Sequence, residues 1–279
     1  ARVVGIIVQL QDGADRSSAL ASINEAVAGA VPGSAATVER EYDNALDGYA
    51  LKAPAGSLSA IRAANGVKAA FIERETPVAD VVGDDAEGGV ASPRGVAQNP
   101  DNLSAQLIMH ADQLTQKGEG KVVAVIDTGV EMTHPAFSGT MTGTPALTAD
   151  DVAALIPKLG EGKAGIYYNE RFPFAYDYAD GDNDAMPSPG DYGSHGTHVA
   201  GITAGDADQI VGVAPDAQII VAKVSRSVEG DITDSALLAA LDDMVVLKPD
   251  VVNLSLGQLG GMDNEADSIY ATVFKSLQA

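Results

Sequence analysis

The sequence contains no cysteine and no long apolar run, and each absence excludes a class of protein. Without cysteine the chain cannot be a disulfide-stabilised scaffold, a zinc protein with thiolate ligands or a cysteine protease. No apolar run reaches the roughly 20 residues that a membrane-spanning helix needs. The chain opens directly in a strand-like run at residues 3–10 and shows no signal-peptide pattern, so we expect any targeting segment to have been removed before this numbering begins.

Basic residues are few. The chain has 17 basic and 39 acidic side chains and a net charge of −22, which argues against nucleic acid and anionic membrane surfaces as partners. Residues 1–100 hold 8 basic and 13 acidic side chains, whereas residues 101–279 hold 9 and 26. This uneven charge predicts two modules, and a chain of 279 residues with 46% hydrophobic content is long enough to bury a sizeable core.

The first 76 residues alternate between strand and helix patterns. The order β-α-β-β-α-β is that of a small ferredoxin-like α+β domain. Residues 77–100 are rich in Gly, Asp and Pro and are typical of an exposed linker. The expected strands are 3–10, 37–42, 48–52 and 67–72, and the expected helices are 17–28 and 58–64, the second with Ser57 as its N-cap.

Residues 101–279 alternate strands and helices over longer distances. Strands separated by helices predict a doubly wound parallel sheet of the α/β class. The expected helices are 104–117, one opening at His195 and 234–247, and the expected strands are one ending at Asp127, 217–224 and 250–256.

Two motifs in this module carry chemistry. Residues 122–129 read Val-Val-Ala-Val-Ile-Asp-Thr-Gly, and residues 195–201 read His-Gly-Thr-His-Val-Ala-Gly. An imidazole can take a proton from a nucleophile, and a carboxylate at a rigid strand end can hold its tautomer and stabilise the imidazolium. In isolation Asp127 would be a turn residue after a strand, but the His195 motif downstream favours a catalytic pair of Asp127 and His195.

Two further blocks follow in order: Gly-Val-Ala-Pro-Asp-Ala at 212–217 and Val-Val-Asn-Leu-Ser-Leu-Gly at 251–257. Together the four blocks resemble the amino-terminal part of the catalytic domain of subtilisin-like serine proteases, the subtilases. The resemblance implies a subtilisin-type sheet, incomplete in this chain, and hydrolysis of peptide bonds by a Ser-His-Asp mechanism. None of the serines lies in the Gly-Thr-Ser setting of the family's nucleophile, so we expect a chain truncated before it and inactive alone.

The same resemblance implies how substrate is bound. Ser255, Leu256 and Gly257 match the strand whose backbone pairs with an extended protein or peptide substrate, and Gly230 aligns by count with the opposite binding strand. A buried strand ending at a Gly turn would explain 251–254 equally well. Residues 1–76 resemble the family's propeptide inhibitor, with the closest likeness at 6–13. The propeptide would then be an intramolecular partner, and the linker 77–100 would contain the processing site.

An insertion separates the two catalytic motifs. Asp127 and His195 are 68 residues apart, more than in compact subtilisins, and the insertion spans about 138–191. Residues 167–180 resemble the cell-envelope proteinases of Gram-positive bacteria, the lactocepin and C5a-peptidase-like branch. This implies a bacterial protein that is secreted or associated with the cell wall.

Two groups of side chains could be metal ligands instead. His195 and His198 form a His-x-x-His pair, but it lacks the His-Glu-x-x-His spacing of a zinc protease. Asp180, Asp182 and Asp184 alternate as in an EF-hand loop, with Asp191 at the twelfth position, although Ala185 replaces the required Gly. A solvated acidic loop is the preferred interpretation and calcium the alternative, so no metal or other cofactor is assigned.

A second function also stays open, a non-catalytic binding or inhibitory protein that keeps the propeptide and half of the cleft.

Overall fold

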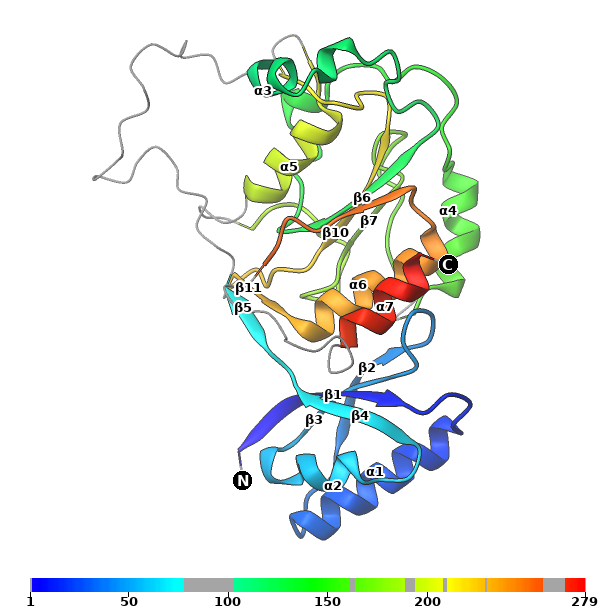
Figure 1. Cartoon of the computed structure of the whole chain (residues 1–279), viewed down its shortest axis with the longest axis vertical. Helices are drawn as coiled ribbons and strands as arrows, with labels where there is room; N and C mark the ends of the chain where they lie inside the picture. The colour runs from blue at the N-terminus through cyan, green and yellow to red at the C-terminus, as the bar shows by residue number, and fades with distance from the viewer. Residues whose placement is uncertain are drawn as a thin grey trace, which may run out of the picture.

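The computed structural model describes residues 2–77, 103–160, 164–188, 194–207, 210–228, 230–257 and 269–278. These residues form an N-terminal unit, residues 2–77, and an α/β unit, residues 103–278. The two units are stacked along the long axis of the molecule, with helices α6 (Asp234–Leu247) and α7 (Ile269–Leu277) of the α/β unit facing the sheet of the N-terminal unit (Figure 1). The linker expected at 77–100 lies almost entirely outside the described residues.

The N-terminal unit is one antiparallel sheet, in the order β2-β3-β1-β4, with α1 and α2 on one face (Figure 1). Helix α1 starts at Asp15, whose carboxylate accepts the backbone N–H of Ser18, and it buries Ala19, Ile23 and Val27 at helical spacing. Ser57 precedes α2 but does not cap it, because its hydroxyl donates to the carbonyl of Pro54 instead. The elements are β1 (Val3–Leu10), α1 (Arg16–Ala30), β2 (Thr37–Tyr42), β3 (Gly48–Pro54), α2 (Leu58–Arg62) and β4 (Val67–Ile72).

The core of this unit gives a first prediction. Ile61 of α2 is fully buried, whereas Ile72 of β4 is 46% exposed. Ile61→Val removes one buried methyl group and should lower the free energy of unfolding by about 1 kcal/mol, whereas Ile72→Val should change it by less than about 0.5 kcal/mol. Urea unfolding of the whole chain measures both. Equal losses of unfolding free energy in the two variants would contradict the difference in burial between Ile61 and Ile72.

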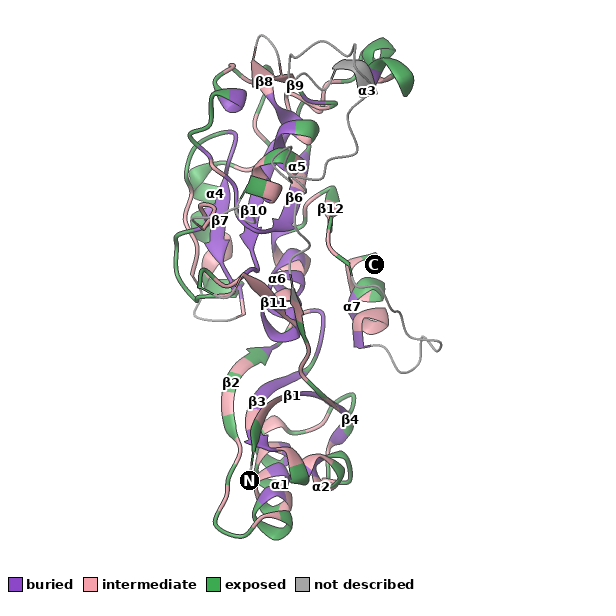
Figure 2. Ribbon diagram, turned by 90° about the vertical axis from the view of Figure 1, so that its left-hand side faces the viewer, coloured by how far each residue is buried: buried purple, intermediate pink, exposed green. Residues whose placement is uncertain are grey.

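The α/β unit is built on a parallel sheet of four strands in the order β12-β6-β10-β7. The central strand β10 is buried along its whole length (Figure 2). Its Ile219 and Val221 pack in one cluster with α5, and Ile220 and Ala222 pack in the other with α6, so the sheet is covered on both faces. The strands are β6 (Val122–Asp127), β7 (Phe174–Asp177), β10 (Gln218–Lys223) and β12 (Val251–Asn253), and the helices are α5 (Ser194–Ala204), α6 (Asp234–Leu247) and α7 (Ile269–Leu277).

Two elements are shorter than predicted. The helix expected at 104–117 is α3 (Leu103–Ile108), because His110 takes a left-handed conformation with φ 57° and ends it. The strand expected at 250–256 is only Val251–Asn253, at the edge of the sheet. Within the insertion, α4 (Ala149–Leu155) begins with a capping box between Thr148 and Asp151. The remaining short elements are η1 (Ala55–Ser57), η2 (Ala111–Gln113), η3 (Pro135–Phe137), η4 (Ile156–Lys158), β8 (Asp206–Ala207) and β9 (Ile210–Val211).

One of the apolar clusters joins the two units. Ile7, Tyr42 and Leu46 of the N-terminal unit belong to the same cluster of buried side chains as α6 and α7. The chain then leaves the N-terminal unit as β5 (Glu75–Pro77), which pairs antiparallel with β11 (Asp231–Thr233) of the α/β unit (Figure 1). We call residues 74–77 the tail. Among the residues described, no helix is long and apolar enough to span a bilayer.

Candidate active site

The acid and the base predicted from the sequence lie side by side. Asp127 is the last residue of β6 and is fully buried, and His195 lies in the first turn of α5. The Nδ1 of His195 is 2.7 Å from the Oδ1 of Asp127, which also accepts the backbone N–H of Thr128 at 2.7 Å. A buried carboxylate next to a ring nitrogen favours the proton on Nδ1. The Nε2 of His195 is then the nitrogen that can accept a proton from a nucleophile.

Two glycines allow this close approach. Gly129 follows the acid with φ 99°, and a Cβ there would lie 2.8 Å from the carbonyl oxygen of Ala185. A Cβ at Gly196 would lie 2.2 Å from the carbonyl oxygen of Gly129. The hydroxyl of Thr128 accepts the backbone N–H of Gly196 at 3.0 Å and so joins the strand end to the helix start. The residues around the acid and the base therefore fix their relative position.

The His-x-x-His pair of the metal alternative lies on α5. His198 is exposed on α5, and no three His, Asp or Glu side chains within the described ranges converge as metal ligands. In the acidic loop, Asp182 and Asp184 each accept a backbone N–H two residues further on. Asp191, the twelfth position of the calcium alternative, lies outside the described residues.

Two of the four residues predicted to bind substrate, Leu256 and Gly257, line one cavity. Leu256 and Gly257 follow the edge strand β12, and Gly230, with φ 72°, forms the turn just before β11. Ser255 is exposed, and its hydroxyl contacts the side chain of Asn253. The cavity, of about 110 Å³, is lined by Leu256, Gly257, Ile232, Thr233, Arg74 and Thr76. The structure thus brings Leu256 and Gly257 together with β11 and the tail, while Ser255 and Gly230 lie next to this group in the chain.

A buried lysine at the same edge of the sheet was missed by the sequence analysis. Lys223 ends β10, in register with Asp127 on one side and Asp177 on the other, and its side chain is 2% exposed. Its Nζ donates to Asp177 at 2.6 Å and to the hydroxyl of Ser227 at 2.7 Å. Burial raises the pKa of Asp177, and the hydrogen bond from Lys223 opposes this rise. Lys223, held by Asp177, thus fixes the position of Ser227 in the segment that leads to β11. A lysine directly after four apolar residues of a strand was the available signal.

A buried carboxylate paired with an imidazole at the carboxyl edge of a parallel sheet is the acid–base half of a subtilisin-type protease site. Residues 118–278 match the subtilase family, and the chain belongs to it.

Among its relatives, the PI-type proteinase of Lactococcus lactis subsp. cremoris is 36% identical over 165 residues, which are 56% of this chain and 8% of that protein. The minor extracellular protease Vpr of Bacillus subtilis (strain 168) is 30% identical over 227 residues, 79% of this chain and 24% of that protein. The chain therefore spans only a small part of these relatives. The solved structure of sphericase aligns with 61% of this chain and 48% of its own at 23% identity and a TM-score of 0.38. The fold assignment depends on the family match and the observed sheet.

Proposed function

We propose that the enzyme is a serine endopeptidase in which Asp127 and His195 are the acid and base of a Ser-His-Asp triad. The observation that carries this proposal is the 2.7 Å contact between the His195 Nδ1 and the buried Asp127 Oδ1 inside the region that matches the subtilase family. The nucleophilic serine is not one of the serines of this sequence, because none of them stands in a Gly-Thr-Ser block. We therefore expect residues 1–279 on their own to be inactive.

The geometry supports a specific division of labour. As the serine oxygen attacks the carbonyl carbon of the substrate, the Nε2 of His195 takes the hydroxyl proton and later gives it to the leaving amine. Asp127 stays ionised, holds the proton on Nδ1 and stabilises the imidazolium. Water repeats the attack on the acyl-enzyme with the same base, which releases the acid product and restores the serine.

The N-terminal unit is proposed to be a ferredoxin-like propeptide that inhibits the enzyme within the same chain. Its tail adds to β11 as an extended peptide would, and Thr76 lies in the cavity that Leu256 and Gly257 line. Processing within residues 77–100 would release it. Ser255, Leu256, Gly257 and Gly230 are then the backbone groups that hold a substrate peptide. A secreted or wall-associated bacterial location fits the relatives, one of which is named an extracellular protease.

A second candidate is a non-catalytic binding or inhibitory protein. It is supported by the peptide-like pairing of the tail with β11, and it would keep the same peptide cleft without hydrolysis.

Labelling with a fluorophosphonate probe separates the two candidates. Residues 1–279 should not be labelled, whereas the protein extended through a Gly-Thr-Ser block should be labelled stoichiometrically, because only a serine activated by His195 attacks the probe. His195→Ala should abolish labelling and His198→Ala, at the exposed histidine, should preserve it. Stoichiometric labelling of residues 1–279 at one of their own serines, lost on His195→Ala, would contradict the proposed location of the nucleophile. An extended protein without label would favour the non-catalytic candidate.

A further inference from the structure

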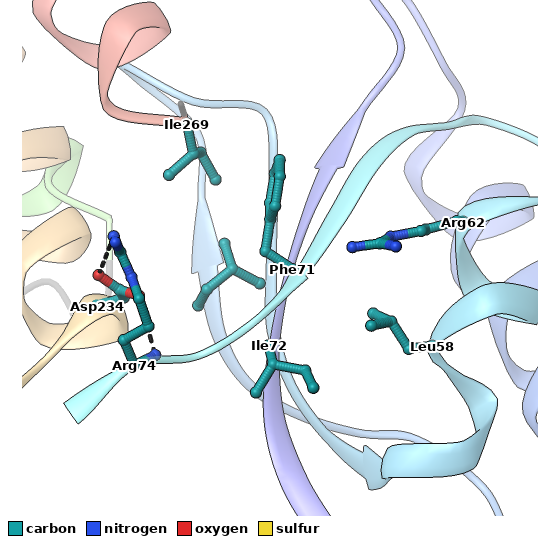
Figure 3. A pocket seen from close by; sticks show the side chains of 8 residues that line it. Leu58, Arg62, Phe71, Ile72, Arg74, Asp234 and Ile269 are labelled. Carbon is teal, nitrogen blue, oxygen red and sulfur yellow. Dashed lines mark hydrogen bonds and ion pairs between the residues drawn. The ribbon is translucent and has the colours of Figure 1, made fainter. Parts of the chain in front are cut away.

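Asp234, the first residue of α6, binds the side chain of Arg74, the residue just before the three tail residues that pair with β11. Asp234 follows β11 directly, and its side chain is only 11% exposed. Its Oδ2 accepts the backbone N–H of Arg74 at 2.9 Å and the Arg74 Nε at 3.0 Å, and its Oδ1 accepts the Arg74 Nη2 at 3.1 Å. Figure 3 shows Arg74 at the rim of a cavity of about 270 Å³ between the two units, with its guanidinium turned toward Asp234.

Tyr270 of α7 completes this environment. Its hydroxyl donates to the Oδ1 of Asp234 at 2.6 Å, and the guanidinium carbon of Arg74 lies 6.0 Å from the centre of its ring. Burial raises the pKa of Tyr270, so the hydroxyl remains a donor over the whole working range of pH. Tyr270, which belongs to the same unit, therefore orients the Asp234 carboxylate. Both carboxylate oxygens face the planar Arg74 guanidinium, which lies next to the Tyr270 ring.

Backbone pairing places a peptide residue at this carboxylate. Thr233 pairs with Glu75, Ile232 with Thr76 and Asp231 with Pro77. The pairing extends one residue beyond the strand, because the Asp234 N–H donates to the carbonyl of Arg74 at 3.1 Å. Any extended peptide that adds to β11 in this register therefore brings the residue before its three paired positions next to Asp234.

The neighbouring charge on the tail is a much weaker determinant. Glu75 forms an ion pair with Arg226 at 3.2 Å, but the Glu75 side chain is 64% exposed. Ion pairs in open solvent contribute little, whereas a two-pronged charged hydrogen bond to a carboxylate shielded from water contributes more. Discrimination between peptides should therefore come from Asp234 and not from Arg226.

We propose that Asp234 and Tyr270 form a binding site for an arginine side chain of peptide substrates, at the residue immediately before the three that pair with β11. In this structure Arg74 occupies the site from within the chain. The inference rests on the proposed function, since it requires that substrate peptides replace the tail on β11. It adds a preference for arginine at one distal position, and the excess of acidic side chains in residues 101–279, 26 against 9 basic ones, favours the approach of basic peptides.

The test compares two peptides with the full-length enzyme after removal of its N-terminal unit. Both contain the sequence of residues 74–77 followed by the same cleavable segment, and one carries citrulline, which has the shape of arginine without its charge, in place of Arg74. The arginine peptide should have a kcat/KM about 10-fold higher, because the neutral side chain loses a two-pronged charged contact. Asp234→Asn should reduce this ratio to about 2 or less. Asp250→Asn, at a carboxylate bound to the start of β6, should leave the ratio unchanged.

The ratio of the two peptides within one enzyme cancels any general loss of activity or folding in a variant. Equal kcat/KM values for the two peptides, or a ratio that Asp234→Asn does not reduce, would overturn the proposed site while the peptidase function stands. If neither peptide is hydrolysed, the proposed function fails, and the affinities of the two peptides then test the arginine site. Fluorescein-labelled forms of the two peptides are then titrated onto the same protein; tighter binding of the arginine form supports the site, and equal affinity overturns it.

Discussion

Replacing His195 by alanine in the full-length enzyme should lower kcat on the order of a million-fold, and Asp127→Asn should lower it about ten-thousand-fold. The base acts together with the nucleophile, so its loss removes nearly all triad-dependent catalysis. The asparagine variant keeps its size but cannot stabilise the imidazolium, and its amide favours the wrong tautomer of His195. Steady-state hydrolysis of a peptide substrate measures both effects.

The matched control is His198→Ala, which removes an exposed imidazole three residues away on the same helix. It should keep kcat within about threefold of the parent enzyme, as expected for a surface substitution. KM should change little in either catalytic variant, because neither side chain belongs to the strands proposed to bind the peptide. A His195→Ala enzyme that retained more than about a hundredth of the activity would contradict the triad assignment.

The parts of this molecule that could be predicted from sequence are those encoded in short segments. The strand ending at Asp127 and the helix opening at His195 are each local patterns, and a parallel sheet brings the carboxyl ends of its strands to one edge. The pair could therefore be predicted although 68 residues separate its members. Thr148 and Asp151 show the same logic at smaller scale, since a capping box spans only four residues.

The parts that could not be predicted depend on partners distant in the chain. The pattern of α6 predicts a helix, but it does not reveal that Asp234 meets Arg74, 160 residues earlier. Lys223 is similar, because its burial depends on Asp177 in the neighbouring strand and on Ser227 beyond the strand end. The left-handed conformation of His110 was also hidden, since only a few non-glycine residues adopt it and the helical pattern continues beyond it. Polar groups in a core acquire their role from packing, which local periodicity does not report.

Two of the polar contacts between the units have the same chemical arrangement. The α/β unit supplies carboxylates from α6, at its first residue and in its third turn. The N-terminal unit supplies donors to them, the Arg74 side chain to Asp234 and backbone N–H groups to Asp242. The donors to Asp242 are backbone N–H groups except for the Nδ2 of Asn44 at 3.1 Å, so the contact should tolerate sequence change elsewhere in the loop but not loss of the carboxylate.

Asp242 is the centre of this second contact. Its side chain lies on α6 and is buried, with 2% exposure. It accepts the backbone N–H of Asn44 at 3.0 Å, of Ala45 at 2.6 Å and of Leu46 at 3.2 Å, all in the loop between β2 and β3. Without the carboxylate these buried N–H groups lose their acceptor, and a buried donor left without a partner is strongly unfavourable.

Asp242→Ala should therefore increase the rate of amide hydrogen exchange at Ala45 and Leu46 by roughly 150-fold, which corresponds to about 3 kcal/mol in the local opening equilibrium. Exchange within α1, on the far side of the sheet, should change little, because its hydrogen bonds do not involve the interface. Exchange of the whole chain followed by mass spectrometry measures both segments.

The matched control is Asp250→Ala, at a carboxylate whose side chain is 37% exposed and which binds Lys121 and the start of β6. It should leave the exchange of Ala45 and Leu46 unchanged. If Asp242→Ala also left it unchanged, the apolar contacts of Tyr42 and Leu46 alone would hold the loop against α6, and the carboxylate would have no part in joining the two units.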